Sequence, residues 1–270
     1  MAKPKKHKHK KHSYKLPAPG SSPGVVFIDE NSLVPRINLY TYNENFYEVK
    51  ELTTIEGLRE QLVDAEYNYW IEIKGFNSFN MFETLNTEWG INKLVLEDIT
   101  RTYQRPQYEV YNSHDFAVSR MLFIDEENVL QNEQLSFILT SNVLITFQDK
   151  YEDCLNAVRN RLSGGKGNIR IGGSSYLMYA LMDLIIDEYF SVLGFWSEEL
   201  DLIEDRLFEK PDRSIMFDTQ AIKRNLITLR RVTWPERDKM NDMLRTDSKF
   251  ISEATKVYLH DAYDHCVQTI

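Results

Sequence analysis

The sequence lacks the patterns that would identify a disulfide-bonded protein, a structural zinc site or a membrane-spanning helix. The two cysteines, Cys154 and Cys266, lie far apart and outside any CxxC or paired-histidine spacing, which argues against a disulfide framework and a structural zinc site. No apolar run approaches the roughly eighteen residues that a membrane-spanning helix requires, so we expect no span within these residues. The cysteine usage also indicates an intracellular protein.

Signatures of nucleotide binding and nucleophilic catalysis are also missing. The glycine-rich segment 163–167 lacks the GxxxxGK[ST] spacing of a phosphate-binding loop and follows no buried strand, so it predicts a turn between domains. His114, His260 and His265 belong to no Ser/His/Asp or Cys/His pattern. We therefore do not expect an enzyme.

Basic residues are concentrated at the start of the chain. Residues 3–15 hold seven lysines and three histidines without an apolar stretch, and a Pro/Gly/Ser linker follows, so residues 1–24 are predicted to be a disordered tail and linker. A solvated tail is the simplest interpretation, with contact to anionic lipid or nucleic acid as the alternative. Beyond the tail, 25 basic residues face 41 acidic ones, a net charge of −16 that opposes nucleic-acid binding and favours cations.

Residues 25–165 show an α/β pattern. Two apolar runs joined at Ser141 and Asn142 predict a hairpin, because a two-residue polar link leaves little room for another connection. The composition of these segments predicts strands at 36–40, 46–49, 69–73, 116–124, 134–140 and 143–147, and helices at 54–63, 79–89 and 151–162.

Residues 166–270 read as long antiparallel helices. Apolar residues recur every three or four positions from 176 to 208, and the break at 210–212 contains a proline. A second helix is expected to run back from about Ile215, with an interruption at Trp234 and Pro235. The last helix, 252–270, ends without a capping residue, so we expect it to continue beyond Ile270.

Several segments, in order along the chain, resemble the CorA-type divalent-cation transporters. They are Leu94-Val95-Leu96-Glu97-Asp98-Ile99 with Gln104-Arg105-Pro106, Glu133-Gln134-Leu135-Ser136 with 143–148, and three helical segments at 176–190, 226–235 and 258–265. The resemblance covers nearly everything from residue 25 onward. It implies an α/β/α sandwich followed by a long-helix stalk, on the cytoplasmic side of the inner membrane in the full-length protein. A Gly-Met-Asn sequence, two membrane-spanning helices and assembly as a homopentamer are implied as well.

The resemblance also implies a set of metal ligands. Asp98 and Asp261 of adjacent protomers would share Mg²⁺, with Glu97, Asp183 and His265 as neighbouring ligands, and the bound ion would hold the channel closed. Co²⁺, Zn²⁺ or Ca²⁺ are the alternative ions. Tyr103 stands where the family can carry a histidine, which leaves a second metal position open.

Other readings of the acidic residues remain open at this point. Asp183, Asp187 and Glu188 lie on an otherwise apolar helix, where buried carboxylates cost free energy unless they are paired or bind metal. A salt bridge to Arg or Lys of the returning helix is expected for Asp187. A metal-dependent hydrolase using these acids with Asp261, a metal-free helical scaffold, and ordinary solvated faces are the competing interpretations.

Overall fold

Seven strands form one mixed sheet in the computed structural model, which describes residues 20, 22–29, 31–209 and 212–270. Their spatial order is β2-β1-β3-β7-β6-β5-β4, and only the β3–β7 pair is parallel among the described neighbours. The strands are β1 Arg36–Tyr42, β2 Tyr47–Leu52, β3 Asn68–Lys74, β4 Gln107–Val110, β5 Asp115–Ile124, β6 Leu130–Leu139 and β7 Val143–Gln148.

The central strands bury both faces, because successive side chains point to opposite sides of a sheet. Ile71 and Ile73 of β3 belong to one hydrophobic core, whereas Trp70 of the same strand belongs to the other. Trp70 stacks on Tyr40 of β1 with ring centroids 4.4 Å apart. The sheet therefore requires a helical layer on each side.

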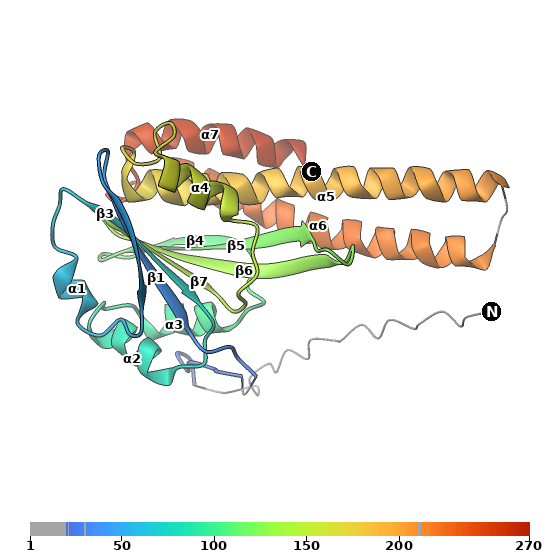
Figure 1. Cartoon of the computed structure of the whole chain (residues 1–270). Coiled ribbons are helices and arrows are strands. Elements are labelled where there is room, and N and C mark those ends of the chain that lie inside the picture. The colour runs from blue at the N-terminus through green and yellow to red at the C-terminus, as the bar shows by residue number, and fades with distance from the viewer. Residues whose placement is uncertain (1–19, 21, 30, 210–211) are drawn as a thin grey trace.

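Short helices cover one face (Figure 1). They are α1 Leu58–Gln61, α2 Phe79–Thr87 and α3 Lys93–Thr100. Side-chain caps begin the two longer ones, because Ser78 accepts from the Met81 amide and Asn92 accepts from the Leu94 amide. In α3 the apolar residues Val95, Leu96 and Ile99 pack in the hydrophobic core on this face of the sheet.

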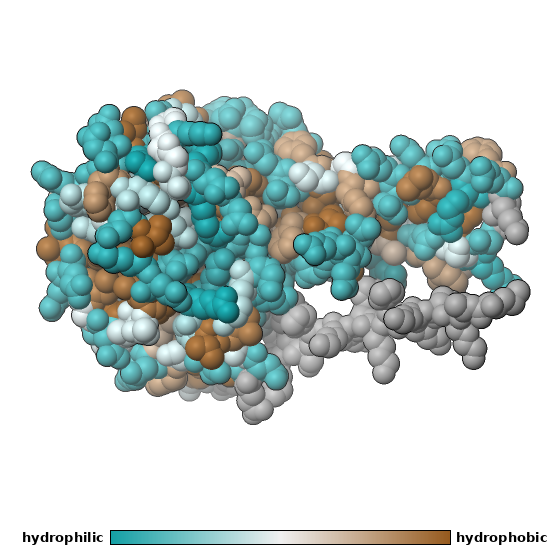
Figure 2. Space-filling model, in the orientation of Figure 1, coloured by the Kyte–Doolittle hydropathy of each residue, from teal (hydrophilic) through white to brown (hydrophobic). Residues whose placement is uncertain are grey.

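A nine-residue helix and three longer helices cover the other face. They are α4 Asn156–Gly164, α5 Gly173–Glu209, α6 Arg213–Arg245 and α7 Glu253–Gln268. The far parts of α5 and α6 extend past the sheet as a two-helix arm (Figure 1), and apolar surface is visible among hydrophilic surface on this arm (Figure 2). The exposed apolar side chains of these two helices include Leu202, Phe208, Met216 and Phe217.

The predicted α/β/α sandwich with long helices after the sheet is confirmed. The predicted interruption at Trp234 and Pro235 is wrong, because α6 continues through both residues. Thr233 before them and Glu236 after them are fully buried. The helix predicted at 54–63 shortens to the four residues of α1, and β4 and α3 were not predicted as separate elements.

Two predicted boundaries remain predictions. Most of the tail at 1–24 and the first two residues of the break at 210–212 lie outside the described residues. The division at 165/166 crosses a shared core, in which Trp70 and Leu144 of the sheet pack with Leu181 and Ile185 of α5. Among the described helices, none is long and apolar enough to cross a membrane.

Candidate metal site

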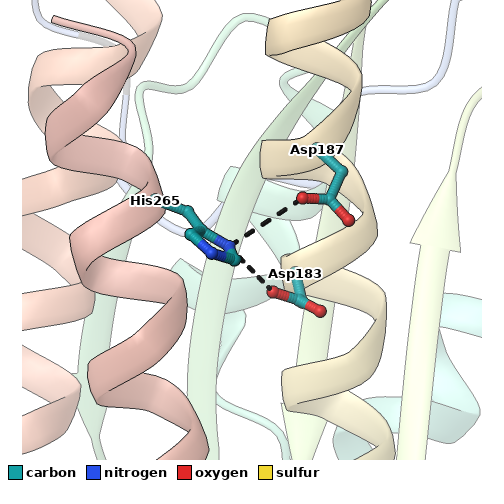
Figure 3. Close-up of side chains that lie close together, drawn as sticks. All are labelled: Asp183, Asp187 and His265. Atoms are coloured by element: carbon teal, nitrogen blue, oxygen red, sulfur yellow. Dashed lines mark ion pairs between the residues drawn. The ribbon is translucent and has the colours of Figure 1, made fainter.

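Two carboxylates of α5 face a histidine of α7 (Figure 3). Asp183 and Asp187 are one helical turn apart and therefore project from the same side of α5. The Nδ1 atom of His265 lies 3.9 Å from Oδ1 of Asp183 and 3.9 Å from Oδ1 of Asp187. One ligand atom from each residue lies within 4.8 Å of the others, so the three side chains converge on a common space.

Two atoms of this cluster are buried without a hydrogen-bond partner. They are Oδ1 of Asp183 and Nδ1 of His265, and 3.9 Å is too long for a hydrogen bond between them. The other carboxylate oxygen of Asp183 accepts a hydrogen bond from the Tyr179 hydroxyl at 3.3 Å. Carboxylate oxygens and an imidazole nitrogen are ligands for divalent ions, so these residues fit a cation.

The electrostatics of the cluster disfavour an additional negative charge. Burial raises the pKa of Asp183, and the neighbouring Asp187 raises it further, while the Tyr179 hydrogen bond and His265 oppose the shift. Burial likewise raises the pKa of Asp187, with His265 lowering it and Asp261 raising it. Positive charge at this position would therefore stabilise both carboxylates.

Asp261 extends the cluster toward solvent. Its Oδ2 lies 4.0 Å from Nε2 of His265, one turn along α7, and its side chain is 66% exposed. Asp187 has its ion pair with His265 of α7 rather than with Arg or Lys of the returning helix α6, so that part of the prediction is wrong. Burial raises the pKa of Glu188, and Asp187 adds to the shift, but Glu188 is not part of the converging group.

Asp98 and Glu97 lie elsewhere, on α3 across the sheet (Figure 1). Asp98 accepts hydrogen bonds from Gln104 at 2.5 Å and Gln107 at 3.3 Å, and burial raises its pKa. Glu97 is 5% exposed and is held by Arg101 and the Gly24 amide. The structure thus brings Asp183, Asp261 and His265 together within one chain, adds Asp187 to them, and keeps Asp98 and Glu97 apart from them.

Sequence comparisons find relatives among ion transporters. The sequence model of the family described as CorA-like Mg²⁺ transporter protein matches residues 65–270. The cobalt/magnesium transport protein CorA of Thermotoga maritima is 32% identical over 252 residues, which are 88% of this chain and 72% of that protein. The putative metal ion transporter YfjQ of Bacillus subtilis is 26% identical over 200 residues, which are 74% of this chain and 61% of that protein.

Two solved structures share the fold. The soluble domain of CorA from Methanocaldococcus jannaschii superimposes with a TM-score of 0.70 at 17% identity, covering 86% of this chain and 89% of that one. The cytoplasmic domain of ZntB from Vibrio parahaemolyticus superimposes with a TM-score of 0.62 at 13% identity, with the same two coverages. At these identities the likeness concerns the fold alone.

Proposed function

Because this chain belongs to the CorA-like Mg²⁺ transporter family, we propose that it is the cytoplasmic, ion-sensing part of a transporter or channel for Mg²⁺. Co²⁺ is an alternative cargo, since the Thermotoga maritima relative bears the name of a cobalt/magnesium transport protein. Zn²⁺ and Ca²⁺ are further alternatives for the bound ion. The family consists of transporters, which disfavours the metal-dependent hydrolase considered from the sequence.

The observation that carries the sensing proposal is the convergence of Asp183, Asp187 and His265. Asp183 Oδ1 and His265 Nδ1 are buried donor or acceptor atoms without partners, and leaving such atoms unsatisfied is costly. Asp261 at the exposed edge would be the ligand through which a neighbouring molecule reaches the ion. Mg²⁺ keeps several waters and needs only one or two carboxylates, so this set is sufficient.

The second half of the proposal is that the ion lies between copies of the chain. Asp98 on α3 and Asp261 on α7 lie on opposite sides of the sheet and cannot share an ion within one molecule. In a ring of like-oriented copies, one face of each molecule meets the other face of the next. A homopentamer anchored through membrane helices that follow this chain is the assembly we propose.

Occupancy would then control how tightly neighbouring copies hold each other. Two carboxylates about 5 Å apart repel by roughly 3 kcal/mol at an effective dielectric of about 20. A divalent cation bound between the two carboxylates replaces this repulsion by attraction. We propose that loss of the ion loosens the ring and favours an open pore.

The test is a magnesium titration followed by thermal unfolding. We expect the melting temperature of the chain to rise with millimolar Mg²⁺, because an ion that binds only the folded state stabilises it. The Asp183→Asn variant should melt above the unmodified chain without metal, since it loses a repelling charge, and its melting temperature should rise less with Mg²⁺. Glu198→Gln removes an exposed carboxylate farther along α5 and should respond as the unmodified chain does. A flat titration of the unmodified chain, or an equal response in Asp183→Asn, contradicts the proposal.

A further inference from the structure

A cleft of about 380 Å³ opens at the end of the sheet where the β6–β7 hairpin turns. Its walls come from α1, the segment after α2, the loop before β5, the hairpin itself and the loop before α7. It shares no residue with the Asp183 cluster. A volume of this size falls within the roughly 300–1,000 Å³ of small-molecule pockets.

The charge of this cleft differs from that of the rest of the protein. Arg59 and Lys249 line it, and its described lining residues include no aspartate or glutamate. The whole chain carries 41 acidic against 32 basic residues. An acid-free cleft with two cations is therefore a local exception, and its potential favours an anion.

Two buried polar atoms of the lining side chains have no hydrogen-bond partner. Trp89 is 7% exposed and His114 is 2% exposed, and neither Trp89 Nε1 nor His114 Nε2 is satisfied. The indole nitrogen can only donate. The His114 ring is fixed by the Ser113 hydroxyl, 2.9 Å from Nδ1, and by stacking on Tyr111, so Nε2 is held in place. When the Ser113 hydroxyl donates to Nδ1, Nε2 carries the hydrogen and becomes a second donor.

The rest of the wall is mixed. Thr140, Ser141 and Asn142 of the hairpin are polar. Leu62, Trp89, Ile91 and Phe250 contribute apolar surface, which a bare inorganic ion would leave without a partner. Pockets of this kind use a few polar groups to orient a mainly apolar ligand. We propose that the cleft binds a small organic anion, a phosphate ester or carboxylate with an apolar body, whose charged group meets Arg59, Lys249 and the Trp89 and His114 nitrogens.

Isothermal calorimetry on the full chain in metal-free buffer tests this proposal independently of the ion-sensing one. The probes are phenyl phosphate, benzoate, inorganic phosphate and benzyl alcohol, which separate the charged group from the apolar body. We expect saturable binding of phenyl phosphate or benzoate, weaker binding of inorganic phosphate and none of benzyl alcohol. Whichever of phenyl phosphate and benzoate binds more tightly identifies the ligand class as a phosphate ester or a carboxylate.

Variants locate the binding. Arg59→Gln and Lys249→Gln each change an exposed side chain, and each should weaken binding about tenfold, the effect of one charge-assisted hydrogen bond. Trp89→Phe keeps an aromatic side chain and removes the indole N–H donor, and should also weaken binding. Lys223→Gln removes an exposed charge on α6 and should leave affinity unchanged. Absence of saturable heat with both aromatic anions, equal binding of benzyl alcohol, or affinity unchanged in all three cleft variants overturns the proposal.

Discussion

Asp153 joins β3 to α4 through a set of close charges. Its carboxylate contacts Lys74 at 2.6 Å and accepts from Arg159 Nη1 at 2.9 Å, while Arg159 Nε also donates to Glu72 at 3.0 Å. Burial alone would raise the pKa of Asp153, but Arg159 and Lys74 outweigh burial and lower it to about 2. The ionised form is therefore stabilised by folding.

This depressed pKa predicts how stability depends on pH. The contribution of Asp153 is fully present above the unfolded pKa of about 4 and is lost as the pH falls toward 2, and it amounts to about 2 kcal/mol at neutral pH. Asp153→Asn should therefore destabilise the chain at pH 7, with a difference that shrinks steadily below pH 4. Urea unfolding of both proteins across this range measures it. A difference that is constant with pH would contradict the assignment.

At the candidate site, only part of the converging cluster could be predicted from the sequence. Asp183, Asp261 and His265 were named from a resemblance, and the structure places them together. The role of Asp187 was missed because helical spacing gives its face on α5 but not the partner across from it, which α7 supplies from 78 residues away. The Trp89 and His114 nitrogens carry no sequence signal, since only the packed structure shows that they lack partners.

Among the elements, α6 carries a buried ion pair that joins it to the sheet. Glu236 and Lys239 are 0% and 1% exposed, and Lys239 Nζ contacts both Glu236 and the Ser119 hydroxyl of β5. Burying two charges is costly, and removal of one partner leaves the other uncompensated. The pair anchors α6 directly after Pro235, and Thr233 before the proline is also fully buried, which helps to explain why the helix continues through it.

Substitutions in this pair should be strongly non-additive. Lys239→Met alone should cost about 3–5 kcal/mol, because it strands a buried carboxylate, and Glu236→Leu alone should cost a similar amount. The double variant should recover most of that loss, since two apolar side chains of similar size replace the pair. Denaturant unfolding of the four proteins completes the cycle. Additive losses would show that the two charges act independently.

The elements themselves were largely predictable. The composition of the strand segments identified β1, β2, β3, β5, β6 and β7, and the helical spacing of 176–208 identified α5. The prediction of a helix break at Pro235 was wrong because it used only the local rule that proline interrupts a helix. Burial of Thr233 and Glu236 keeps this part of α6 helical. The four-residue strand β4 is too short for its alternation to be distinguished from a loop.

For the whole molecule, the two-sided sheet determines which surfaces copies can present to each other. One helical layer carries Asp98 and the other carries Asp261, so each copy offers one acid from each face. The proposed ion site between copies therefore needs one intact Asp98 and one intact Asp261 from different chains. This separation allows the two contributions to be tested in separate proteins.

Mixing two defective chains should restore part of the magnesium response. Asp98→Asn and Asp261→Asn chains should each fail to associate with added Mg²⁺, because every interface then lacks one carboxylate. In an equimolar mixture, about one interface in four pairs the intact Asp98 of one chain with the intact Asp261 of the other. Sedimentation velocity with millimolar Mg²⁺ should therefore show partial association of the mixture. The Asp98→Asn/Asp261→Asn double variant, measured alone, should show no association. A mixture that behaves as either variant alone would place the two acids in separate sites.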